Sequence, residues 1–315
     1  MRAVPVLLVT SARTRLTGER VGGQPAGVGN VFADGTAVRP AGPGRYEAQI
    51  DDAWNLRPLP QGGVVTALAL RAMAAELGES GQRLRTLHTT FAAQVTDGPV
   101  EIEVELLRRG RTMSHLRSEV RNPGAARGHL TTGIFGASRE GFDFTDLRPP
   151  PDLPRPDECP SFRDPPPPGV PEFEPMPFWE RLVEGRPALG LAPWEEGDRD
   201  RAERAQWYRL DDPPWLEDGT IDPLSLVVLC DVMPGAVGER LGPQERMWFA
   251  PSVDLTVHLF SDCRSPWVLG HNTARHAGDG YASADMALWD FGPDYRDEPR
   301  LVAYATQVFL FTFSA

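Results

Sequence analysis

The chain has 315 residues, of which 41% are hydrophobic and 24% are charged, and its net charge is −12, a composition typical of a globular protein. The acidic balance argues against a nucleic-acid-binding protein, because such proteins carry basic surfaces that neutralise phosphates. Lysine is absent from the sequence, which excludes both a Schiff-base lysine and the lysine of a Walker-type phosphate loop.

The cysteines and the apolar runs indicate the cellular compartment of the protein. The 3 cysteines are widely spaced and odd in number, so they form neither a CxxC motif nor a disulfide framework. We expect free thiols in a reducing compartment, and therefore a cytoplasmic protein. No apolar run reaches the roughly 18 residues that a membrane-spanning helix needs, so we expect no membrane span.

The first part of the chain reads as an extension followed by one folded unit. Residues 1–42 are rich in Gly, Pro and Arg without periodicity, and we expect them to form a loop. Residues 43–145 are predicted to fold as a unit with a strand at Arg45–Trp54 and a helix from Gly63 to Leu77. Apolar residues then alternate with glutamates between Val100 and Leu106, which is the period of a half-buried strand. Further strands are predicted at Met113–Arg121 and His129–Ala137.

A proline-dense segment at residues 146–177 divides the chain. Proline lacks the amide donor that helices and inner strands require, so this segment is predicted to be an extended linker. Residues 178–315 then form the second unit. Asp222 followed by Pro223 predicts a helix start, and we expect this apolar helix to run to Val232. Strands are predicted at Phe178–Leu182, Gln206–Leu210, Ser252–Phe260, Trp267–Arg275, Tyr281–Asp290 and Leu301–Phe313.

The same order of elements therefore occurs twice: strand, apolar helix, then a run of long strands. One buried helix packed against antiparallel strands makes a two-layer α+β unit. The predicted fold is a tandem double hotdog, in which each half has a central helix wrapped by a curved antiparallel sheet. We expect one sheet to continue across both halves.

Asp231 is the most informative residue of the sequence. It lies in the apolar run from Leu226 to Met233, where a carboxylate is unfavourable unless it is paired, hydrogen-bonded or protonated. Its position favours a functional acid or base, although one solvated point on a buried helix would also explain it. The first helix has no acid until Glu76 near its end. We therefore expect one active site per chain, in the second half.

Two further polar residues lie on otherwise apolar strands of the second half. Ser252 opens the predicted strand at Ser252–Phe260, and Gln307 lies among Val, Phe and Leu. A buried glutamine needs hydrogen-bond partners and could orient a water or a carbonyl. A solvent-facing position for Gln307 is equally compatible with the sequence, because the strand parity there is ambiguous.

Several short motifs together resemble the TesB-type acyl-CoA thioesterases, a family of double-hotdog enzymes. The motifs are PQGGVV at 60–65, LHTTF at 87–91, LRRGRTMS at 107–114, CDVMP at 230–234, PSVD at 251–254 and VAYATQ at 302–307. They follow the family's order and spacing from about residue 45 to residue 313.

The resemblance implies an acyl-thioester hydrolase without a cofactor, acting in fatty acid metabolism. The family's Asp/Thr/Gln trio maps onto Asp231, Ser252 and Gln307, with serine in place of threonine. Asp231 would be the general base that activates a water, and the other two would hold that water. The helix-start amides of Gly62 and Gly63 could bind the substrate by polarising the thioester oxygen.

We expect no metal site, because His271 and His276 are five apart on one strand and point to opposite faces. A hotdog hydratase would pair the acid with a nearby His, and Asp231 has none in the following twenty residues. Two alternatives stay open: a pathway-specific hotdog enzyme of natural-product biosynthesis acting on a carrier-bound acyl chain, and a catalytically silent acyl-binding protein. The expected partner is an acyl-CoA or acyl-carrier-protein thioester, with homo-oligomer formation left open.

Overall fold

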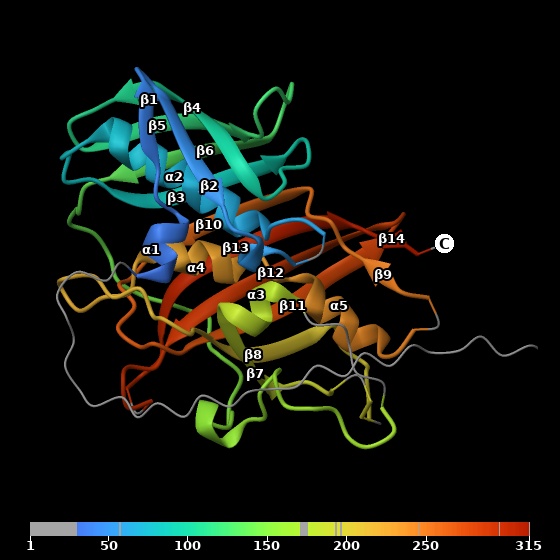
Figure 1. The fold of residues 1–315 in the computed structure, drawn as a ribbon. Helices are drawn as coiled ribbons and strands as arrows, with labels where there is room; N and C mark the ends of the chain where they lie inside the picture. The colour runs from blue at the N-terminus through green and yellow to red at the C-terminus, as the bar shows by residue number, and fades with distance from the viewer. Residues whose placement is uncertain are drawn as a thin grey trace, which may run out of the picture.

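Strand pairing in the computed structural model joins both halves of the chain into one sheet. The structure describes residues 30–56, 58–170, 176–192, 194–195, 197–244, 246–295 and 297–314. The 12-stranded sheet has the order β1-β2-β4-β5-β6-β3-β10-β13-β12-β11-β8-β7, and all of its pairs are antiparallel. The predicted continuous antiparallel sheet is therefore confirmed. Figure 1 shows the N-terminal half, in blue to green, above the C-terminal half, in yellow to red.

The two halves contribute equal numbers of strands to this sheet. The first half supplies β1 (Arg39–Gly42), β2 (Arg45–Ile50), β3 (Arg83–Phe91), β4 (Gly98–Arg109), β5 (Met113–Arg121) and β6 (His129–Gly136). The second supplies β7 (Val183–Leu189), β8 (Glu203–Leu210), β10 (Asp254–Leu259), β11 (Val268–Gly278), β12 (Tyr281–Asp290) and β13 (Arg300–Leu310). The halves meet where β3 pairs with β10, with Thr90 opposite Asp254. A separate two-stranded sheet pairs β9 (Trp248–Phe249) with β14 (Thr312–Phe313).

The central helices are α2 (Gly62–Leu77) in the first half and α4 (Pro223–Cys230) in the second. The residues of α2 from Gly63 to Leu70 are all buried, and so are those of α4 from Leu224 to Cys230. The start of α2 lies against the end of α4, because a Cβ added at Gly63 would be 2.8 Å from the Cα of Val228. Both expected central helices are confirmed. Together with the 12-stranded sheet they form the predicted double hotdog.

The helix of the second half ends earlier than the predicted Val232. Asp231 is its C-cap and leaves the helical conformation, with φ −95° and ψ 48°. Pro234 then begins a new helix, α5 (Pro234–Leu241). The missing amide of Pro234 explains the break, because it cannot donate to the carbonyl four residues earlier. Asp231 thus caps a helix and does not lie in the middle of one.

Two other expectations are corrected. The segment up to residue 42 was predicted to be loop. Residues 1–29 lie outside the described part of the chain, but Val31–Gly35 form α1 and Arg39–Gly42 form β1. The Asn30 side chain caps α1 by accepting from Phe32 N–H, and Phe32 is fully buried against Trp54. Local capping and burial therefore order this segment despite its composition.

The predicted strand at Phe178–Leu182 is instead α3 (Pro177–Arg181), which is followed by β7. Pro177 stands at the first helical position, where its missing amide has no cost. Phe178 is fully buried and contacts Trp54 of the first half. Within the described residues, no helix combines the length and apolar character needed to cross a membrane.

Candidate active site

Asp231 lies at the junction of the two halves, in the turn between α4 and α5. Its side chain is buried, with 6% relative exposure. A side-chain hydrogen bond stabilises this turn: Asn272 Nδ2, on β11, donates to the carbonyl of Met233 at 2.8 Å. The first turn of α2 faces the carboxylate from the other half. The acid is thus held by backbone elements from both halves.

The three residues singled out in the sequence converge in the structure. Ser252 Oγ donates to Asp231 Oδ1 at 3.1 Å. Gln307 Nε2 donates to the same carboxylate oxygen and to Ser252 Oγ, the latter at 2.9 Å. Gln307 points inward, with 2% exposure, and Ser252 is half-buried. The strand ladder begins two residues after Ser252, which itself makes an isolated bridge to Phe309.

Gln307 has unused hydrogen-bonding capacity at this site. Its Oε1 is buried and has no partner among the described residues, whereas its Nε2 is engaged by Asp231 and Ser252. A buried acceptor of this kind is unfavourable unless another donor reaches it. A water or substrate group next to Asp231 could supply that donor.

The glycine pair at the start of α2 contacts the acid directly. Gly63 N–H donates to Asp231 Oδ2 at 2.8 Å, and the Gly62 amide also bonds to this side chain. From the sequence, we expected that these amides could polarise the thioester oxygen of a substrate. In the structure they donate to the carboxylate and stabilise it, because the positive end of the α2 dipole points at Asp231.

Gln61 joins the two helices and was not singled out from the sequence. Its Nε2 donates to the carbonyls of Val228 and Asp231, at 2.8 and 3.0 Å, while its Oε1 accepts from Val64 N–H at 2.9 Å. It therefore caps α2 and holds the end of α4. Its position directly before the glycine pair that begins the helix could have identified Gln61 from the sequence, because N-cap side chains occur there.

Burial and hydrogen bonding act on Asp231 in opposite directions. Burial is the larger effect and raises the pKa of Asp231 to about 6, although the bonds from Gln307, Ser252, Gly63 and Gly62 lower it. A carboxylate with this pKa is mostly ionised at neutral pH and is a stronger base than a solvated aspartate. These are the properties that general-base catalysis requires.

Phe91, at the end of β3, covers the acid from the first half. A Cβ added at Gly62 would lie 2.6 Å from Phe91 Cε1 and 2.8 Å from Asp231 Oδ2. The aromatic ring and the carboxylate therefore both lie against the same backbone position, and only glycine leaves room for them. Phe91 also makes an edge contact with His129, at 4.8 Å between ring centroids. Burial lowers the pKa of His129 to about 4, so this imidazole is neutral at neutral pH.

The opposite end of the helix pair contains different chemistry. There Arg71 of α2 forms an ion pair with Asp222, the N-cap of α4. The residue before Arg71, Leu70, is buried and apolar, so it supplies no acid or base at this end. In the first half, Gly133 lies close to Met73, whose sulfur would be 2.9 Å from an added Cβ. The trio of Asp231, Ser252 and Gln307 is therefore found at one end of the helix pair only.

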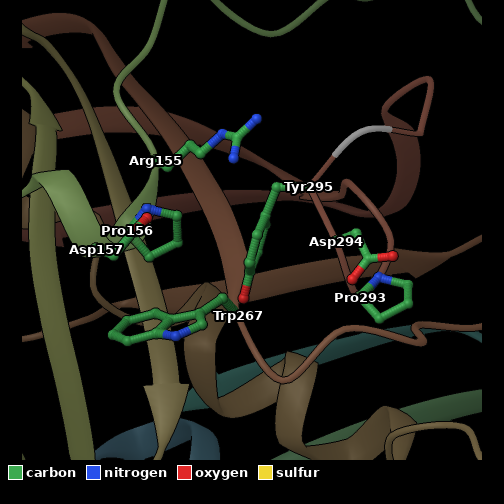
Figure 2. A pocket seen from close by; sticks show the side chains of 7 residues that line it. All are labelled: Arg155, Pro156, Asp157, Trp267, Pro293, Asp294 and Tyr295. Atoms are coloured by element: carbon green, nitrogen blue, oxygen red, sulfur yellow. The ribbon is translucent and has the colours of Figure 1, made fainter.

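The pocket in Figure 2 lies apart from these residues. It measures about 480 Å³ and is lined by Arg155, Pro156, Asp157, Trp267, Pro293, Asp294 and Tyr295. Its wall combines the proline-rich segment with the β12–β13 connection. None of the catalytic candidates lines it. Among the described residues, no cluster of three or more His, Cys, Asp or Glu side chains could hold a metal ion.

Comparison with protein families gives two matches that follow each other along the chain. Residues 50–136 match the acyl-CoA thioesterase N-terminal domain, and residues 156–311 match the acyl-CoA thioesterase C-terminal domain. No curated protein sequence matches the chain.

Solved structures share the fold over most of the chain. A hot dog fold protein of unknown function from Alicyclobacillus acidocaldarius is 25% identical, with a TM-score of 0.74, and the match covers 91% of this chain and 100% of that one. The acyl-CoA thioesterase II TesB2 from Mycobacterium marinum is 18% identical, with a TM-score of 0.66 and coverage of 90% and 99%. The tesB protein from Mycobacterium avium subs paratuberculosis is also 18% identical, with a TM-score of 0.65 and coverage of 89% and 98%.

Proposed function

Because this chain belongs to the acyl-CoA thioesterase family and is a thioester hydrolase of the TesB type, we propose that it hydrolyses acyl-CoA with Asp231 as general base. The observation that carries the proposal is the convergence of Asp231, Ser252 and Gln307 within hydrogen-bonding distance at a buried position. The pKa of about 6 supports it, since the carboxylate is then both ionised and basic at neutral pH.

The chemistry needs one water and one base. Asp231 removes a proton from the water while the water oxygen bonds to the thioester carbon. The oxyanion then re-forms the carbonyl, the carbon–sulfur bond breaks, and the proton held by Asp231 passes to the departing sulfur, which leaves as the free thiol. Gln307 Oε1 is the free acceptor at the site and would orient the second proton of the water. Ser252 would align the carboxylate through Oδ1.

The roles of Gly62 and Gly63 follow from their contacts. Both amides donate to Asp231, so we assign them to the carboxylate and not to the thioester oxygen. Their bonds favour the ionised form of the acid. This assignment explains how a buried aspartate keeps a pKa near 6 and avoids the higher value that burial alone would give.

The test is Asp231→Asn with detection of the free thiol released from a panel of acyl-CoA substrates. We expect turnover to fall about 10²-fold or more, the scale of a lost general base. Gln307→Ala should reduce turnover less, because a water can replace part of the amide. Glu76→Gln is the matched control: this acid lies on the other central helix, bonded to Tyr46, and its change should leave turnover as in the parent.

Folding of Asp231→Asn is expected, because Gln307 can rotate its amide and offer Oε1 to the new side-chain donor. If the purified, folded variant releases thiol as fast as the parent, the mechanism is wrong. If neither the parent nor the variant hydrolyses any thioester but the parent binds acyl-CoA, the acyl-binding alternative replaces it. Hydrolysis of carrier-protein thioesters alone would favour the carrier-bound alternative.

A further inference from the structure

Phe91 lies close to the carboxylate of Asp231. A Cβ placed on Gly62 would be 2.6 Å from Phe91 Cε1 and 2.8 Å from Asp231 Oδ2, so the ring carbon and the carboxylate oxygen are separated by no more than the sum of these two distances. A water activated by Asp231 lies about 3 Å from the carboxylate, and the thioester carbon lies about 3–3.5 Å from that water. The ring and the reacting carbon therefore lie at similar distances from the acid.

Phe91 also lies on a side of the acid that solvent reaches. Asp231 itself is 6% exposed. Four of its neighbours keep partial exposure: Gly62, Phe91, Val232 and Ser252. A substrate that brings its thioester to the acid approaches over these residues, and Phe91 has the largest side chain among them. The aromatic ring is therefore a wall that the substrate has to pass.

The position of Phe91 is fixed by contacts on both sides. Its N–H donates to the carbonyl of Val253 at 3.0 Å, and Ala93 N–H donates to the carbonyl of Gly128 at 3.2 Å. The ring makes its edge contact with His129, a buried side chain at the paired position of the neighbouring strand β6. A larger group next to the acid cannot displace Phe91 without breaking these contacts.

The chemistry of the substrate decides which of its atoms such a wall can distinguish. The reacting carbon carries the carbonyl oxygen, the sulfur and the α-carbon of the acyl chain. Oxygen and sulfur are the same in every acyl thioester, so substrates differ first at the α-carbon. A methyl branch there adds a group next to the reacting carbon, in the region that the ring borders. Overfilling a packed apolar site is unfavourable.

We propose that Phe91 determines the acyl specificity of this enzyme by excluding branches at the carbon next to the thioester carbonyl. The preferred substrates are then straight-chain acyl thioesters, and α-methyl-branched acyl thioesters are poor substrates. The proposal rests on the proposed function, because it takes the position of the water and the thioester from that mechanism. Phe91 acts on the substrate and not on the acid, so its replacement changes the ratio between substrates.

The experiment compares three acyl-CoA substrates. The first is the straight chain of at least four carbons that the parent hydrolyses fastest, and the other two are its 2-methyl and 3-methyl derivatives. These derivatives are isomers, so they differ only in the position of the branch. The kcat/KM of each substrate is measured for the parent, for Phe91→Ala and for Phe91→Leu.

Phe260→Leu is the matched control. Phe260 is 51% exposed and directly follows Leu259, where β10 ends. Ser252 precedes the other end of this strand, so Phe260 lies away from the acid. The control removes the same ring as Phe91→Leu but leaves the surroundings of Asp231 unchanged.

We expect the parent to hydrolyse the 2-methyl substrate about 10- to 100-fold less well than the straight chain, the scale on which one carbon in a fitted site is discriminated. The 3-methyl substrate should lose less. In both Phe91 variants the preference for the straight chain over the 2-methyl substrate should fall at least about fivefold, whereas Phe260→Leu should keep the parental ratio. The intrinsic reactivity of each substrate is the same with every variant, so a changed ratio reports on the site.

A uniform loss on all three substrates in the Phe91 variants would indicate a structural role and overturn the proposal. Equal hydrolysis of the 2-methyl and 3-methyl substrates by the parent would overturn it as well, and this comparison needs no variant. If Phe91→Ala does not fold, Phe91→Leu decides, because it removes the ring and keeps an apolar side chain.

Asp231→Asn separates this proposal from the proposed function. The ratio between substrates is taken within one protein, so it does not depend on which group activates the water. Parental hydrolysis of the straight-chain substrate by Asp231→Asn contradicts the general-base mechanism, whereas an unchanged ratio in the Phe91 variants contradicts only the role of Phe91.

Discussion

The backbone amide of Gly63 donates to the carboxylate of Asp231 across the boundary between the two halves of the chain. The first half supplies the helix N-terminus and the second half supplies the acid. Gln61 strengthens the same boundary through its bonds to the end of α4. The site therefore depends on both hotdog units, although the acid, the hydroxyl and the amide side chains all come from the second.

The first prediction concerns pH. Burial raises the pKa of Asp231 to about 6, and only the ionised form can accept a proton from water. We expect kcat/KM to be constant above neutral pH and to fall about tenfold per unit well below pH 6, the slope for one essential base. The profile should be measured on a neutral acyl thioester. A profile that stays flat down to pH 4.5, with the protein still folded, contradicts the assignment.

The second prediction concerns Gly62→Ala. The added methyl group would meet Phe91 at 2.6 Å and Asp231 Oδ2 at 2.8 Å, distances at which one of them must move. We expect turnover to fall at least about tenfold, since ~1 Å displacements at a reacting centre can cost far more. Gly238→Ala on α5 is the control, because the nearest atom, in Trp248, is 3.8 Å from its Cβ. Equal activity of the two variants would show that Gly62 does not set the site geometry.

Much of the fold followed from local patterns. The predicted strands Met113–Arg121 and Tyr281–Asp290 have the bounds of the structure. The first buries every second residue, whereas the second is buried at every position from Met286 to Asp290. The errors arose where tertiary contacts decide. Phe178 lies in a short apolar run that fits either a strand or a helix. In the structure this run is the helix α3, and Phe178 packs against Trp54.

The candidate site was predictable in part for the same reason. Asp231 and Gln307 stood out because a polar side chain in an apolar run needs a partner. Their convergence could not be derived, because it depends on the pairing of β13 with β10 and on the break before Pro234. The contact of Phe91 with Gly62 joins distant parts of one half and left no periodic signal.

The third prediction concerns the asymmetry of the two helix ends. Arg71 pairs with the buried Asp222, so Arg71→Met leaves an uncompensated carboxylate at the start of α4. We expect a loss of roughly 1–3 kcal/mol in the free energy of unfolding, less than for a fully buried pair because Arg71 is partly exposed. Turnover per folded molecule should be unchanged. Denaturant unfolding and the turnover per mole of folded protein check both points. A halved turnover of the folded variant would indicate a second catalytic site at this end.

The last prediction links the acid to stability. The pKa of Asp231 is about 6 in the folded protein, against 3.8 for an ordinary aspartate. The folded state thus binds this proton more tightly than the unfolded state does. The resulting stabilisation is present below pH 3.8 and is lost as pH rises through about 6. At ~1.4 kcal/mol per pKa unit, the loss amounts to at most about 3 kcal/mol.

Asp231→Asn cannot titrate, so it should not show this loss. The free energy of unfolding of the variant relative to the parent should therefore increase between pH 4 and pH 7.5, with most of the increase below pH 6.5. Urea unfolding at a series of pH values measures it, and taking the difference cancels the groups that titrate alike in both proteins. A pH-independent difference for Asp231→Asn would mean that the folded protein does not raise the pKa of Asp231, and the basis for its role as a strong base would be lost.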